Sequence, residues 1–123
     1  MEEIKRSGSP RAVGVKGSEI TVAVPLNSSP SPEWVHFFQE FPSEWTSMSH
    51  PKLIDVEGSD LLFSSEERYF ADWIRLIDKW IGDANRQYRE YLETLHRKQE
   101  RQDEQERERQ QRIQEATAKL RGL

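Results

Sequence analysis

The first half of the chain alternates between strand-like and helix-like spacing of its hydrophobic residues. From Glu19 to Leu26, apolar side chains occupy every second position, which is typical of a strand with one buried face. Pro25 lacks a backbone N–H and therefore predicts that this strand ends there or lies at an edge. Before it, residues 1–17 are rich in Gly, Ser and charge. They predict a flexible N-terminal arm that contains at most a short strand at 12–15.

A short helix follows the strand. Ser31 can cap it, and Pro32 suits the first helical position because that position needs no N–H donor. The apolar residues after it fall at spacings of three and four, which predicts one aromatic helix face; they are Trp34, Phe37, Phe38 and Phe41. Residues 42–51 lie between two prolines and predict a loop that contains Trp45.

Two short apolar runs come next and predict a β-hairpin. They lie at 52–57 and 60–64 and flank the turn sequence Glu-Gly-Ser-Asp. After the second run, Ser64 and Glu67 have the spacing of a capping box, so the sequence predicts a helix that begins near residue 65.

The second half of the chain predicts one long helix. From Phe70 to Leu95 the apolar positions are spaced alternately by four and three residues, which is a heptad seam. Trp73 and Trp80 broaden the seam in its first half, as expected of a helix that lies on a sheet, and after Ala84 it narrows. The run from His96 to Arg112 contains no apolar residue, yet its Gln, Glu, Arg and Lys favour helix. A short apolar stripe resumes at Ile113, in a phase shifted from the heptads.

These patterns predict an α+β fold with a small antiparallel sheet, in the order strand, helix, strand, strand, helix. Two helices would cover the sheet, and the C-terminal one would be very long, with a coiled-coil-like second half. We expect a flexible arm at 1–17, a small aromatic-rich α+β domain at 18–84 and a projecting polar helix at 85–123.

Composition narrows the classes of function. Acidic side chains outnumber basic ones by 22 to 18, so the chain lacks the excess of Lys and Arg that nonspecific binding to nucleic acid or anionic membranes requires. The absence of Cys excludes disulfide scaffolds, thiol catalysis and Cys-based zinc sites. The chain shows neither the apolar core of a signal peptide nor a run long enough to span a bilayer, and we expect a cytoplasmic protein without a membrane partner.

No catalytic, cofactor-binding or metal site is predicted. His36, His50 and His96 have no ligand-type neighbours at helical spacing, and no nucleotide or hydrolase motif occurs. The acidic residues around the hairpin turn lack the spacing of a calcium loop. We therefore expect a protein without a cofactor that is not an enzyme. The remaining enzymatic alternative is an active site assembled between subunits.

The leading hypothesis is a protein–protein interaction protein, an adaptor or accessory subunit of a larger complex that forms a homodimer or other oligomer through the long helix. The alternative for the aromatic residues is a role in the domain core, and the alternative for the polar run is a solvated helix. The residues predicted to bind a partner are Trp45, Trp73, Tyr88, Tyr91, Leu92, Leu95, Ile113, Ala116, Leu120 and Leu123.

The second hypothesis is an antitoxin-like or DNA-binding regulator, in which the small domain binds a target and the helical tail binds a protein. A nucleic-acid partner is possible under this hypothesis but is not favoured by the charge balance. A DNA-binding form would require a basic surface, for which the candidates are Arg75, Lys79, Arg86 and Arg89.

Overall fold

The computed structural model describes residues 3–123 and has the predicted α+β fold. Contacts divide the chain into two compact units, a folded domain that ends at Tyr88 and a helical segment from Arg89 to Leu123. The two units are described separately below.

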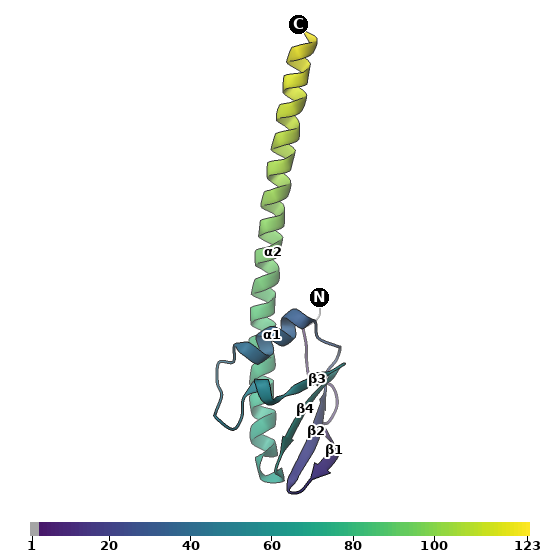
Figure 1. Cartoon of the computed structure of the whole chain (residues 1–123), viewed down its shortest axis with the longest axis vertical. Helices are drawn as coiled ribbons and strands as arrows, with labels where there is room; N and C mark the ends of the chain where they lie inside the picture. Colours follow the sequence, from purple (N-terminus) through teal and green to yellow (C-terminus); the bar gives the residue numbers. More distant parts are fainter. Residues whose placement is uncertain (1–2) are drawn as a thin grey trace. The chain divides into compact units, whose positions relative to one another are not determined.

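The folded domain is built on a four-stranded antiparallel sheet (Figure 1). Its strands are β1 (Arg11–Lys16), β2 (Glu19–Pro25), β3 (Asp55–Glu57) and β4 (Asp60–Ser65), in the spatial order β1-β2-β4-β3. Both hairpins turn through two residues, and Gly17 and Gly58 take the positive φ angles of 63° and 59° that such tight turns require. The turn predicted between 57 and 60 is confirmed.

Four helical elements accompany the sheet: α1 (Pro32–Glu40), the 3₁₀ turns η1 (Pro51–Leu53) and η2 (Glu67–Tyr69), and α2 (Phe70–Arg121). α1 begins as predicted, since the Ser31 side chain accepts a hydrogen bond from the backbone N–H of Trp34 and Pro32 occupies the first turn. The beginning of α2 runs beside the sheet. α1 lies across α2, near one end of the sheet (Figure 1).

One aromatic-rich core joins these elements. Trp34 and Phe38 of α1 stack at 5.2 Å, and Phe38 meets the edge of Trp80 from α2. On the sheet, Val22 pairs with Phe63 and Val24 with Leu61, so that β2 and β4 present their buried side chains to the same core. Burial of such large side chains contributes on the order of 2 to 3 kcal/mol each, which is how a small domain reaches a stable core.

The N-terminal residues differ from the predicted arm. Residues 11–16 form β1, where the sequence predicts at most a short strand at 12–15, and Ile4 lies in the core. Arg6 forms an isolated β-bridge with Leu26. The prediction missed these contacts because Ile4 is a lone apolar residue in a polar stretch, which leaves no period to detect.

Two boundaries are corrected. The long helix was predicted to begin near residue 65, but β4 extends to Ser65 and α2 begins at Phe70. The predicted capping box is absent because the hydroxyl of Ser64 lies 2.9 Å from that of Thr21, on the neighbouring strand. The strand predicted at 52–57 is shorter, since Pro51–Leu53 is a 3₁₀ turn.

The heptad seam is largely the core face of the domain. Ile77, Ile81 and Ala84 are buried, and Tyr88 packs against the same core. The narrow seam that was predicted to leave the domain at Ala84 therefore begins only after Tyr88. Gly82 lies on the exposed side of α2, and a β-carbon added there would meet nothing within 4 Å, which excludes close packing at this glycine.

Candidate interaction surfaces

The loop between α1 and η1 is hydrogen-bonded to α2. The side-chain amide of Gln87 donates to the carbonyl of Phe41 at 2.9 Å. Asp83, which is buried, accepts from both the backbone N–H (3.0 Å) and the hydroxyl (2.5 Å) of Ser43. Hydrogen bonds to a buried carboxylate are among the stronger ones in proteins, so they hold the start of this loop in a defined place.

Glu44 continues the attachment through both its backbone and its side chain. Its carbonyl accepts from the indole N–H of Trp80 at 2.6 Å, and its carboxylate lies 2.8 Å from the Lys79 ammonium and 3.6 Å from the Arg75 guanidinium. The hydrogen bond from Lys79 and the positive charge beside it lower the pKa of Glu44 below its usual value, and Arg75 adds a smaller contribution in the same direction. The loop that leads to Trp45 is thus held at three successive points.

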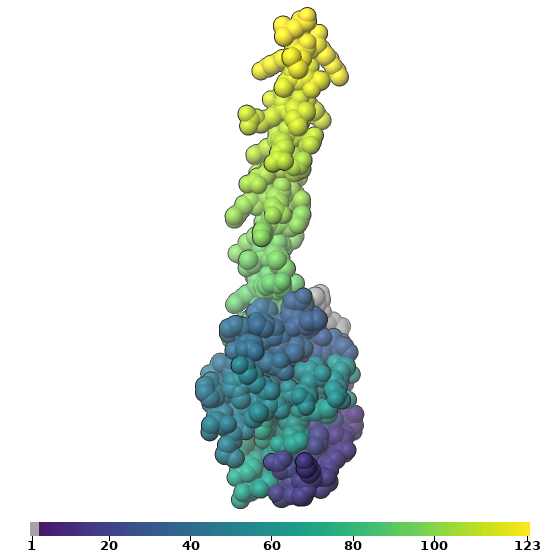
Figure 2. Space-filling view, in the orientation of Figure 1, coloured from purple at the N-terminus to yellow at the C-terminus, as the bar shows by residue number. Residues whose placement is uncertain are grey.

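Beyond these attachments the loop exposes large apolar side chains. Trp45 is 58% exposed, and its ring meets that of His50 in an edge-to-face arrangement with centroids 5.2 Å apart. Phe41, Met48 and Leu53 are also exposed, and the segment that carries them forms part of the outer surface of the domain (Figure 2). We call these four residues the loop surface. Docking sites are typically rich in exposed apolar and aromatic side chains, so the loop surface is the candidate docking site of the folded domain.

The sequence predicted only one member of the loop surface. Trp45 was named because a large apolar residue stood between two prolines, but Leu53 was placed in a strand and Met48 gave no signal. The proline that follows His50, which starts a 3₁₀ turn, was the available sign that Leu53 lies outside the sheet.

Trp73 is not an exposed anchor. It is 6% exposed and stacks on Phe63 of β4 with ring centroids 5.0 Å apart. Because its ring is enclosed by the core, it stabilises the domain and is removed from the candidate partner-binding residues. The alternative weighed for the aromatic side chains, a role in the core, therefore holds for Trp73.

The remaining candidates lie in the helical segment, except Tyr88, which is the last residue of the folded domain and packs against its core. Every residue from Glu93 to Leu123 is exposed, and Ile113 and Leu120 are 52% and 67% exposed. Leu95 and Ile113 are 18 residues apart, which is about five full turns at 3.6 residues per turn, so both point to the same side of the helix. Leu123 lies beyond the end of α2 at Arg121, so helical spacing does not place it. Tyr91, Ala116 and Leu120 fall near the same side as Leu95 and Ile113 by the same spacing rule. We call this set the apolar face.

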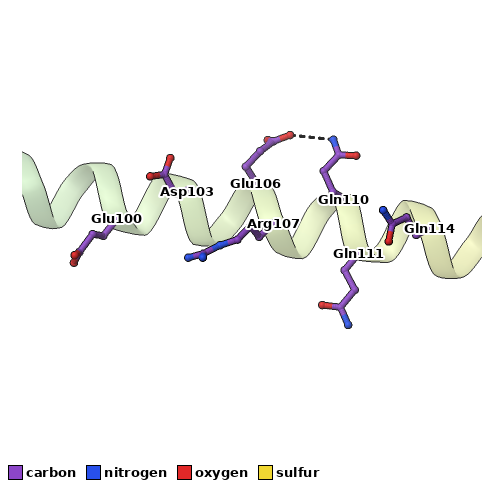
Figure 3. Close-up of a pocket in the computed structure, with 7 residues that line it drawn as sticks. All are labelled: Glu100, Asp103, Glu106, Arg107, Gln110, Gln111 and Gln114. Atoms are coloured by element: carbon purple, nitrogen blue, oxygen red, sulfur yellow. Dashed lines mark hydrogen bonds between the residues drawn. The ribbon is translucent and has the colours of Figure 1, made fainter.

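The apolar face is interrupted by polar side chains in the middle of the segment. Seven polar side chains around Glu106 line a shallow, open hollow along the helix. They project from α2 in different directions, and Gln110 donates to Glu106 at 3.2 Å (Figure 3). All seven belong to α2 alone, so the hollow has a wall on one side only and does not enclose a ligand.

The candidate basic surface is largely compensated by carboxylates. Arg75 and Lys79 share Glu44, and Arg86 lies 3.7 Å from Asp83. Ion pairing of these cations reduces the field that attracts DNA phosphates, which does not favour a DNA-binding form. Within residues 3–123 no group of three or more His, Asp or Glu side chains is arranged to hold a metal ion, and no helix is long and apolar enough to cross a membrane.

Comparison with known proteins gives no relative. The chain matches no protein-family model, no curated protein and no solved structure. Its function is therefore argued from its own surfaces.

Proposed function

We propose that this protein is a non-enzymatic protein–protein interaction protein, an adaptor or accessory subunit of a larger complex, which associates through its helical segment from Arg89 to Leu123. The observation that carries the proposal is the apolar face. Its leucines, isoleucine and tyrosine stand on one side of a helix whose residues from Glu93 onward all face solvent within this chain.

The energetics of an isolated helix support this function. Helices gain most of their stability from packing an apolar stripe, and i, i+4 polar pairs add only about 0.2 to 0.5 kcal/mol each. The segment has such pairs, for example Gln99 with Asp103 and His96 with Glu100, and no core of its own. A second helix against the apolar face supplies the missing packing.

The loop surface gives the protein a second place to bind. It lies wholly within the folded domain, whereas the apolar face lies wholly within the helical segment. Two separate surfaces are what an adaptor requires, because each can bind a different protein. The cytoplasmic location expected from the sequence stays a prediction.

The proposal is tested by affinity capture from the native cells followed by mass spectrometry. The baits are the full chain, the chain truncated after Leu95, and two full-length variants, Ala116→Glu and Ala118→Glu. Ala116 belongs to the apolar face, and Ala118 is about 200° further around the helix, so the two variants add the same charge on opposite sides.

We expect proteins that are captured by the full chain and by Ala118→Glu to be lost with Ala116→Glu and with the truncated chain. Capture that is the same with all four baits contradicts a binding role for the helical segment.

A further inference from the structure

The spacing of the seam positions in the helical segment is the same when it is counted from either end. From the N-terminal end, the seam runs through Tyr91, Leu95 and Lys98, with spacings of four and three. From the C-terminal end, it runs through Leu120, Ala116 and Ile113, again with spacings of four and three. The phase shift before Ile113, which interrupts a simple heptad repeat, is what creates this symmetry.

The symmetry continues to the middle of the segment. After Lys98 the forward series reaches Gln102 and Gln105, and after Ile113 the reverse series reaches Arg109 and Glu106. The two series meet between residues 105 and 106. A helix with such a centre can lie against a second copy that runs in the opposite direction, because a two-fold axis through the centre exchanges the two series.

We infer that a second copy of this chain covers the apolar face in antiparallel orientation, with residues facing each other when their numbers add up to 211. This inference rests on the proposed function and names the partner. Tyr91 then packs on the partner copy's Leu120, Leu95 on its Ala116, and the aliphatic stem of Lys98 on its Ile113.

Repulsion between like charges favours the antiparallel orientation over the parallel one. In a parallel, in-register pair, Lys98 would face Lys98 of the other copy and Arg109 would face Arg109, and these like charges repel at short range. In the antiparallel pair, Arg109 faces a Gln102 and Lys98 faces an Ile113, so neither cation meets another cation. The polar residues at the centre of the segment are therefore compatible with the antiparallel pair and destabilise the parallel pair.

The length of the segment agrees with the same register. Arg89, where the helical segment begins, is opposite Gly122, the residue after the last helical position. The pairing thus uses the whole segment and leaves no unpaired helical end.

The test measures distances between spin labels in the full-length chain. The sequence has no Cys, so Glu104→Cys and Ala118→Cys each introduce one label per copy, and both sites lie away from the apolar face. In the antiparallel pair the two 118 labels are about 38 Å apart along the axis, while the two 104 labels are within about 5 Å along it, at 1.5 Å per residue.

A long distance at 118 together with a short one at 104 is the expected result. Short distances at both sites would show a parallel pair and overturn the inference, as would a monomer without dipolar coupling at micromolar concentration. A monomer whose capture of other proteins still depends on Ala116 would leave the proposed function standing, so the two failures are distinguishable.

Discussion

The side chain of Asn85 binds both backbone groups of Ile4. Its amide nitrogen donates to the Ile4 carbonyl at 2.8 Å, and its oxygen accepts from the Ile4 N–H at 3.2 Å. The same oxygen accepts from the indole N–H of Trp34 at 2.9 Å. One amide on α2 therefore joins the N-terminal residues, α1 and α2.

Replacement of Asn85 by Ala should destabilise the domain by about 2 to 4 kcal/mol, because it leaves the indole N–H of the buried Trp34 and the Ile4 backbone without partners. The measurement is urea unfolding followed by tryptophan fluorescence. Asn27 is the matched control, since it also holds the N-terminal residues, through Lys5 and Glu3, but with exposed hydrogen bonds. A loss for Asn27→Ala that equals the loss for Asn85→Ala would refute the role of burial.

The ionisation of Glu44 should depend on Lys79. A lowered pKa means that the folded state favours the charged carboxylate, so the stabilisation is complete above the usual pKa of Glu and is lost as pH falls through the lowered folded value. Lys79→Met should raise the pKa of Glu44 toward its usual value, and Arg75→Met should raise it less. A ¹³C carboxyl titration by NMR measures both shifts, and equal shifts would contradict the leading role of the Lys79 hydrogen bond.

Gly82→Ala should stabilise the domain by about 1 kcal/mol. The residue is exposed inside α2, an added β-carbon meets no atom within 4 Å, and Ala restricts the unfolded chain. Gly58→Ala is the opposite case, because its positive φ of 59° strains any side chain in the turn. Thermal unfolding should therefore move to higher temperature for the first variant and to lower temperature for the second. A lower unfolding temperature for Gly82→Ala would mean that this position is not an ordinary exposed helix site.

Replacement of the two candidate tryptophans by Ala should destabilise the domain to very different degrees. Trp73→Ala leaves a cavity beside Phe63 and should cost about 3 to 5 kcal/mol, whereas Trp45→Ala removes a mostly exposed ring and should change stability by less than about 1 kcal/mol. Chemical denaturation measures both. A large loss for Trp45→Ala would mean that its ring is part of the core and not of the loop surface.

The sequence allowed prediction of the elements that bury a periodic face. β2, α1 and the core side of α2 follow from spacings of two, three and four residues, and the α1 cap follows from Ser31 and Pro32. β1 was predicted only in part because its apolar residues, Val13 and Val15, are exposed at an edge. Its pairing comes from backbone hydrogen bonds with β2, which leave no hydrophobic period.

The candidate surfaces were predictable to different degrees. Exposed seam residues such as Leu95 and Ile113 could be named from spacing alone. Trp73 was misplaced because spacing places a residue on a face of α2 but does not say how wide the covering sheet is. The loop surface depends on Asp83 and Glu44, whose hydrogen bonds join residues about 40 positions apart and have no local signature.

The decisive measurement is sedimentation velocity of the purified full-length chain beside its Ala116→Glu and Ala118→Glu variants, from micromolar to hundred-micromolar concentration. If a second copy covers the apolar face, the unchanged chain and Ala118→Glu sediment as dimers. Ala116→Glu then weakens the dimer by about tenfold or more, because a charge is buried opposite Leu95. Self-association through this face would be contradicted if all three chains sediment as monomers, or if all three form dimers of equal strength.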